Sequence, residues 1–192
     1  VIDLGLVERK GSVQISNEIY QEVIPRELTW VTQSGFAVDR SWYMHENGTL
    51  NMPELIKGFQ VFFRKHSEHW VETFQYKEAG PQLLLQAFLQ RIVNGGGLIE
   101  REYGLGRKRT DLYIRMPFDG GYQEIILELK IQYGSRQTTI DEAIPQTVEY
   151  MDKCGTKEGH VIIFDRSKER GWDDKIFSDE RYQAQGVTVW GC

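Results

Sequence analysis

The sequence predicts an α/β fold, in which a mixed β-sheet packs against helices. Three observations indicate this class. Apolar residues recur at helical spacing over residues 55–92, three short alternating segments separated by turns occupy residues 98–131, and a helical segment and an apolar strand follow over residues 139–164. The order helix, three strands, helix, strand is typical of a mixed sheet flanked by helices.

Composition supports a folded protein. The 192 residues suffice for one substantial domain, and the 12% of aromatic residues argues against disorder. No apolar run approaches the roughly 20 residues that cross a bilayer, and the first residues do not resemble a secretory signal. Cys154 and Cys192 lie in no metal-ligand spacing, which favours reduced thiols in a cytoplasmic protein. Because the chain lacks a starting Met, we expect it to be a piece of a longer protein.

The N-terminal part reads as separate small elements. A hairpin is expected around Lys10, Gly11 and Ser12, followed by a short helix that Ser16 would cap and Pro25 would disturb. A hairpin and helix in this order favour the tail of a winged-helix domain. We therefore divide the chain into a winged-helix-like tail over residues 1–34, a helical connector over residues 35–77 and a main domain over residues 78–192.

Two helices precede the sheet. Asn51 is the expected cap of the first, with Pro53 in its first turn and Glu54 at the capping-box position. Its aromatic stripe predicts a core-facing side, although the aromatic residues between Trp42 and Phe74 could instead face a partner. The second helix is expected over residues 81–93, and the glycines after Asn94 end it. That glycine run does not match a phosphate-binding loop.

The sheet is expected to begin with strands over residues 98–103, 110–115 and 124–131, the last two joined by a turn at residues 117–121. A helix over residues 139–153, ended by Gly155, then leads to strands over residues 160–164 and 187–190. Since side chains alternate along a strand, Glu128 and Lys130 share one face. If the second and third strands pair as a hairpin, Asp111 lies near both.

Two interpretations of this charged face remain open. It is either the solvated side of a half-exposed hairpin, or a group of charges gathered for chemistry. Two carboxylates about 4 Å apart repel by about 4 kcal/mol at an effective dielectric constant near 20, and a divalent cation between them relieves that repulsion. Oxygen ligands suit Mg²⁺, which can activate water and stabilise the charge of a phosphoryl transition state. A neighbouring lysine could orient that water. The paired carboxylates, the cation and the lysine together predict metal-assisted phosphodiester hydrolysis.

These residues resemble the PD-(D/E)XK nuclease superfamily, in a likeness that extends from Glu78 to about Asp165. The stretch "QTVEY", which begins at Gln146 and ends at Tyr150, is similar to the Q-x-x-x-Y motif of the exonuclease-like branch. The resemblance implies a restriction-endonuclease-like sheet.

The same resemblance assigns roles to individual residues. Asp111, Glu128 and the Leu129 carbonyl would bind Mg²⁺ or Mn²⁺, with Glu78 as a further acid, and Lys130 would position water. Gln146 and Tyr150 would order the site. Thr110 replaces the proline of the motif, and Pro145 must start or kink the helix beside Gln146.

Longer stretches resemble bacterial proteins that fuse an AAA-type ATPase to a C-terminal nuclease-like domain. They include "LGLVERKGSVQISNEIYQEVIPREL", "LLLQAFLQRIVNGGG" and "EYGLGRKRTDLYI". This implies that residues 1–34 end an upstream ATPase region.

A basic strip precedes the acidic residues. Arg107, Lys108 and Arg109 are expected to contact phosphates, although they could also be a solvated loop on a chain of net charge −5. We expect a metal-dependent deoxyribonuclease domain with DNA and the attached ATPase as partners. The alternative is an inactive nuclease-fold module that binds nucleic acid or regulates the ATPase.

Overall fold

The structure is a computed structural model, which describes residues 7–10, 12–15, 42–73, 79–93, 96–105, 108–167 and 169–192. The chain divides into two compact units, Val1–Arg40 and Ser41–Cys192, which are described separately. In the first unit, β1 (Val7–Lys10) and β2 (Ser12–Ile15) pair antiparallel with Lys10 opposite Ser12. This confirms the predicted hairpin. The helix expected after Ser16 falls outside the described residues, so the winged-helix interpretation stays a prediction.

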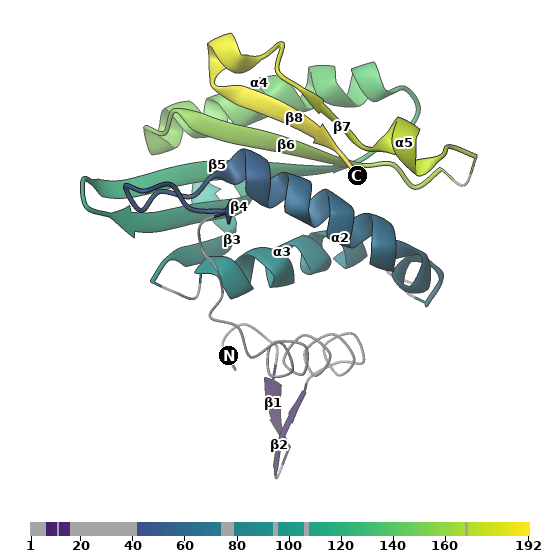
Figure 1. Ribbon diagram of the computed structural model, residues 1–192, viewed down its shortest axis with the longest axis horizontal. Coiled ribbons are helices and arrows are strands. Elements are labelled where there is room, and N and C mark those ends of the chain that lie inside the picture. Colours follow the sequence, from purple (N-terminus) through teal and green to yellow (C-terminus); the bar gives the residue numbers. More distant parts are fainter. Residues whose placement is uncertain are drawn as a thin grey trace. The chain divides into compact units, whose positions relative to one another are not determined.

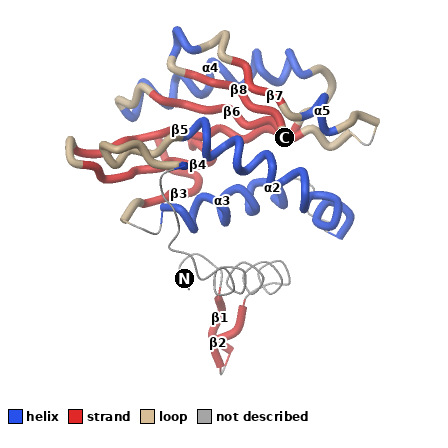
Figure 2. The backbone as a smooth tube through the Cα atoms, viewed as in Figure 1, coloured by secondary structure: helices blue, strands red, loops and turns tan. Residues whose placement is uncertain are grey.

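A six-stranded mixed sheet forms the centre of the second unit, in the order β3-β4-β5-β6-β8-β7 (Figures 1 and 2). The strands are β3 (Leu98–Leu105), β4 (Lys108–Phe118), β5 (Gly121–Ile131), β6 (Glu158–Phe164), β7 (Phe177–Asp179) and β8 (Val187–Gly191). β3, β4 and β5 form an antiparallel meander, whereas β5, β6 and β8 run parallel. The edge strand β7 pairs antiparallel with β8. The predicted mixed sheet is therefore confirmed.

Helices lie on both faces of this sheet (Figure 1). α4 (Arg136–Cys154) connects β5 to β6 and packs its buried residues Ile140, Ala143 and Ile144 against the sheet. On the other face, α2 (Met52–Thr73) places Phe59 and Phe63 against Phe164 of β6, with ring centroids 6.3 and 5.4 Å apart. α3 (Ala79–Val93) packs beside α2, and the short helix α5 (Trp172–Lys175) follows β6. The described part of the α2 aromatic stripe is thus core.

Local sequence explains where these helices begin and end. The Asn51 side chain accepts a hydrogen bond from the Glu54 N–H (3.3 Å), as its capping position predicts. α4 begins three residues earlier than residue 139, because Ser135 caps it by accepting from the Thr138 N–H (3.1 Å). It ends at Gly155, whose φ of 69° is a left-handed conformation that glycine adopts without steric cost.

Pro145 lies inside α4 without ending it, so of the two expected alternatives, a helix start or a kink, the helix start is wrong. Proline removes the N–H that would bond the carbonyl of Asp141, four residues earlier. Both residues are exposed, so water can hydrate that carbonyl. The helix therefore continues to the residues that follow Pro145. Among the described helices, none is long and apolar enough to cross a membrane.

Candidate active site

Asp111 lies where the pairing of β4 and β5 opens. Their paired register runs from Phe118 opposite Gly121 to Leu112 opposite Leu127, and Asp111 is the next residue of β4. Its carboxylate Oδ2 accepts a hydrogen bond from the Leu129 backbone N–H at 2.8 Å. The Asp111 side chain thus accepts the hydrogen bond that a backbone carbonyl of β4 would otherwise accept. This bond holds the Asp111 carboxylate against β5 beside Glu128.

Glu128 is a carboxylate buried in the sheet, with its side chain 1% exposed. Oε1 accepts a hydrogen bond from Lys130 Nζ at 2.7 Å. Oε2 is buried and has no hydrogen-bond partner among the described residues. Burial and the negative charge of Asp111 raise the pKa of Glu128 to about 7, although the Lys130 ammonium acts in the opposite direction. The site therefore holds a carboxyl group that titrates near neutrality.

Lys130 is fixed by a chain of hydrogen bonds from α4. Its Nζ donates to Gln146 Oε1 at 3.0 Å, and Gln146 Nε2 donates to the Tyr150 hydroxyl at 2.9 Å. Gln146 and Tyr150 are one helical turn apart, so both project from one side of α4. Tyr150 is buried and Lys130 is partly exposed, so the chain runs from the core toward solvent and orients the ammonium.

The donor set fits a divalent cation of the Mg²⁺ class. The Asp111 carboxylate is bonded to β5 at the residue after Glu128, and Glu128 carries a buried oxygen with no partner among the described residues. A buried carboxylate oxygen without a partner needs an explanation, and a bound cation would supply one. Asp111 and Glu128 would hold the cation, and the Leu129 carbonyl remains the predicted third oxygen. The structure thus brings together Asp111, Glu128, Lys130, Gln146 and Tyr150, the core of the predicted set.

The remaining predicted residues fall wholly or partly outside the described structure. Glu78 and Arg107 are outside it, while Lys108 and Arg109 are placed by their backbone at the start of β4. Arg109 occupies the strand position two residues before Asp111. Among the described side chains, no three His, Cys, Asp or Glu residues gather around one point. The roles of Glu78 and of the basic strip stay predictions.

A second polar cluster, not predicted from the sequence, links β6 and β8. Trp190 Nε1 donates to His160 Nδ1 at 3.1 Å, and His160 Nε2 lies 3.2 Å from Glu158 Oε1. Gln123 Nε2 donates to Glu158 Oε2 at 3.0 Å, and Gln123 also exchanges hydrogen bonds with the backbone of Leu50. The only sequence signal was a histidine at the start of an apolar strand. This cluster fastens the segment before α2 to the sheet.

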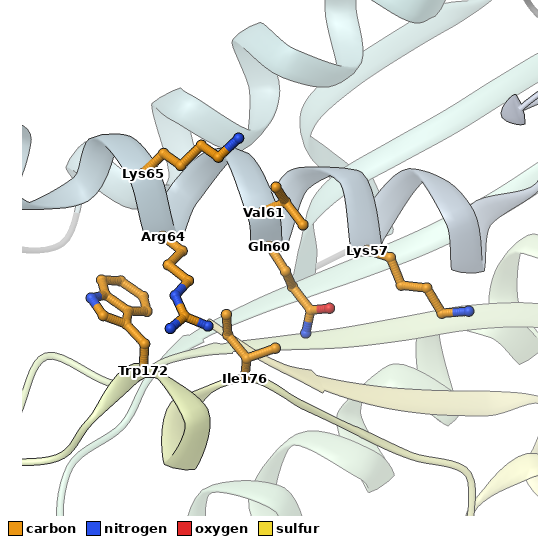
Figure 3. A pocket seen from close by; sticks show the side chains of 7 residues that line it. All are labelled: Lys57, Gln60, Val61, Arg64, Lys65, Trp172 and Ile176. Atoms are coloured by element: carbon orange, nitrogen blue, oxygen red, sulfur yellow. The ribbon is translucent and has the colours of Figure 1, made fainter.

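A hollow of about 670 Å³ lies between α2 and α5 (Figure 3). Its cations are partly neutralised, because Arg64 pairs with Asp173 at 2.9 Å and Lys57 pairs with Glu54 at 2.8 Å. Its lining residues are Lys57, Gln60, Val61, Arg64, Lys65, Trp172 and Ile176. No carboxylate is among these lining residues, so the hollow does not repeat the paired acids of Asp111 and Glu128.

Comparisons with known proteins add no information on the site. No family model, curated protein or solved structure matches the chain.

Proposed function

We propose that residues 78–192 form a metal-dependent nuclease domain that hydrolyses phosphodiester bonds of DNA. One observation carries the proposal: the Asp111 carboxylate is held on β5 next to Glu128, whose second oxygen is buried without a partner among the described residues. The sequence resemblance to the PD-(D/E)XK superfamily, extended by the spacing of Gln146 and Tyr150, supports the reaction class. We also propose that the mixed sheet of this chain has the restriction-endonuclease-like arrangement of strands.

The chain's own residues have distinct tasks in this reaction. A bound cation would supply Lewis-acid stabilisation of the phosphoryl oxygens and acidify a water. Asp111 and Glu128 hold their carboxylates together for it. Lys130 uses two of its three N–H donors on Glu128 and Gln146, which leaves the third to orient water or a phosphate oxygen. Gln146 and Tyr150 fix the ammonium in place, so they are positioning residues.

The test is a pair of measurements on the purified chain and on Asp111→Asn. An asparagine can still accept the Leu129 N–H, so the variant removes the charge and preserves the fold-supporting bond. We expect the parent chain to bind Mn²⁺ in calorimetry and to cleave DNA with Mg²⁺ or Mn²⁺. Asp111→Asn should lose cleavage by about 10³-fold, given the size of metal and electrostatic effects on catalysis.

Asp141→Asn is the matched control, since Asp141 is an exposed aspartate on α4 that accepts a hydrogen bond from Gln137. It should cleave at the parental rate. If Asp111→Asn cleaves DNA at the parental rate in assays free of contaminating metal and contaminating nucleases, the assignment is wrong.

One observation favours a second candidate, an inactive module that binds nucleic acid or regulates the attached AAA-type ATPase. Glu128 and Lys130 already form an ion pair at 2.7 Å, so they neutralise each other without a cation. This candidate predicts no Mn²⁺ binding tighter than millimolar and no cleavage of single- or double-stranded DNA. The calorimetric titration therefore separates the two functions.

A further inference from the structure

The lining of the hollow between α2 and α5 carries three cationic side chains and no carboxylate (Figure 3). Lys57, Arg64 and Lys65 lie on one side of α2, because helical residues seven and eight positions apart share a side. Lys57 and Lys65 are about 12 Å apart along the helix axis, at a rise of about 1.5 Å per residue. Lys65 has no ion-pair partner among the described residues. The hollow therefore favours an extended anionic ligand.

The two ion pairs at this hollow are exposed and easily exchanged. The Asp173 side chain, which pairs with Arg64, is 89% exposed, and the Glu54 side chain, which pairs with Lys57, is 46% exposed. Surface pairs of this kind contribute little to stability, so another anion can replace the carboxylate at small cost. Arg64 contacts Asp173 through Nη1, whereas a guanidinium can bind a phosphate through two parallel hydrogen bonds. A phosphate is thus a better partner for Arg64.

An indole and a buried ammonium lie together beside these cations. Trp172 lines the hollow, and its ring makes an edge contact with Phe63, with ring centroids 6.0 Å apart. Lys175 is 9% exposed, and its Nζ lies 5.1 Å from the centre of the Trp172 ring. Lysines this deeply buried are usually paired with an anion, but Lys175 has no ion pair among the described residues. An anionic group near the Trp172 ring would compensate this charge.

A buried amide also lines the hollow. Gln60 is 5% exposed, and its Nε2 donates to the backbone carbonyls of Phe177 at 3.0 Å and Gly191 at 2.7 Å. These two bonds use both amide hydrogens, so Oε1 remains as an acceptor with no partner among the described residues. A nucleobase suits this combination, because its edge has N–H donors and its face stacks on an indole. A carboxylate-rich peptide would pair with the cations but would not use the indole face.

We propose that the hollow between α2 and α5 binds single-stranded nucleic acid, with a base on Trp172 and phosphates on Arg64 and Lys65. A cationic groove with an aromatic platform is the general way in which proteins hold single strands. The inference rests on the proposed nuclease function and names the form of nucleic acid that the domain holds. It also gives a chain of net charge −5 a local surface that attracts phosphates.

Four variants separate the effects of charge, stacking and folding. Lys65→Ala removes a cation from the hollow, and Lys153→Ala removes an exposed lysine of α4 as the matched control. Trp172→Leu removes the aromatic face, whereas Trp172→Phe keeps an aromatic ring. Melting temperatures will show whether each variant is folded, and Lys65→Ala tests the proposal even if Trp172→Leu is not.

The experiment measures the fluorescence anisotropy of a labelled single strand of about 12 nucleotides with the whole chain. EDTA in the buffer prevents metal-dependent cleavage, and the titration is repeated at several salt concentrations. Each lost phosphate contact reduces the slope of log affinity against log salt by about 0.7 for single strands. We expect this change in Lys65→Ala. Trp172→Leu should weaken binding by about tenfold with the parental slope, since base stacking does not depend on counterions.

Lys153→Ala and Trp172→Phe should bind the strand as the parent does. A parental slope in Lys65→Ala, parental affinity in a folded Trp172→Leu, or no binding by the parent would overturn the proposal. Tighter binding of the corresponding duplex would do the same, as would equal competition by polyglutamate, which has charge without bases. The nuclease assignment is judged separately, by metal-dependent cleavage in the parent and its loss in Asp111→Asn, so the two proposals can fail independently.

Discussion

Two glutamates on the adjacent strands β5 and β6, Glu128 with its side chain 1% exposed and Glu158 with its side chain 34% exposed, have opposite electrostatic behaviour. Burial and the charge of Asp111 raise the pKa of Glu128 to about 7. Burial acts in the same direction on Glu158, but hydrogen bonds with His160 and Gln123 outweigh it and lower the pKa of that carboxyl. Deeper burial and the nearby charge of Asp111 thus raise the pKa of Glu128, whereas two hydrogen-bonding side chains lower the pKa of the more exposed Glu158.

The partners of the two residues also suggest different purposes. Both oxygens of Glu158 are bonded, and Trp190, a donor only, makes His160 Nδ1 the acceptor, so that Nε2 can donate to Glu158. This cluster is satisfied and needs no further ligand. Glu128 lies beside a second carboxylate and keeps one oxygen without a partner among the described residues. Perturbed and incompletely paired groups of this kind are typical of functional sites.

The largest effect that would sharpen this contrast is expected at Lys130. Lys130→Ala removes the ammonium that orients water in the proposed mechanism, and positioned acid–base groups contribute about 10²–10⁴-fold to catalysis. We expect cleavage to fall by that range while Mn²⁺ binding in calorimetry is retained. Lys153→Ala, which deletes an exposed lysine paired with Glu149 on α4, should cleave normally. A parental rate in Lys130→Ala would remove this residue from the mechanism.

The next effect is on stability, and it has opposite signs at the two glutamates. The pKa of Glu128 rises from 4.5 to about 7 on folding, so the folded chain binds a proton that the unfolded chain releases. Its contribution to stability is therefore full below pH 4.5 and is lost as the pH rises through 7. The lost contribution is about 3 kcal/mol, at about 1.4 kcal/mol for each pH unit. Glu158, with a lowered pKa, instead contributes stability that is lost as the pH falls below 4.5.

Urea unfolding of the parent and Glu128→Gln between pH 5 and pH 8 measures this difference. The variant has no titrating group at this position, so its unfolding free energy should gain up to about 3 kcal/mol on the parent across that range. Saturating Mn²⁺ should remove the decline in the parent, because a ligand that binds the folded state stabilises it. Glu158→Gln should keep the parental slope between these pH values and cost about 1 kcal/mol throughout. Parallel profiles of the parent and Glu128→Gln would contradict the raised pKa.

Much of the fold could be predicted because periodicity and local breakers determine it. Alternation in β4 and β5 placed Glu128 and Lys130 on one face, and the turn at residues 117–121 implied the hairpin that aligns Asp111 with them. The strand ends were predicted too short, since β4 runs from Lys108 to Phe118 and β5 begins at Gly121. The missed residues continue these strands because they pair across the hairpin, with Met116 opposite Gln123 and Pro117 opposite Tyr122.

Long-range features lay beyond what the sequence could predict. The strand β7 was missed, because its three residues are held by pairing with β8 rather than by a pattern of their own. The hydrogen bond from Leu129 to Asp111 depends on two strands separating at one position, which no spacing rule anticipates. The Gln123–Glu158–His160–Trp190 cluster likewise joins residues from three strands, none of which carries a recognisable motif.

The smallest effect tests whether the hydrogen-bond chain from α4 only positions Lys130. Tyr150→Phe removes the hydroxyl that accepts from Gln146 Nε2 while it keeps the buried ring. Loss of one partly buried hydrogen bond should lower the unfolding free energy by about 1 kcal/mol. Cleavage should fall by less than about tenfold, since Gln146 still accepts from Lys130 and 1.4 kcal/mol corresponds to a factor of ten. Tyr122→Phe, at a tyrosine that is 58% exposed, is the control for removal of a hydroxyl. If Tyr150→Phe lowers the cleavage rate as much as Lys130→Ala does, the Tyr150 hydroxyl contacts the substrate. Tyr150 would then be a catalytic residue of α4 and not a positioning residue.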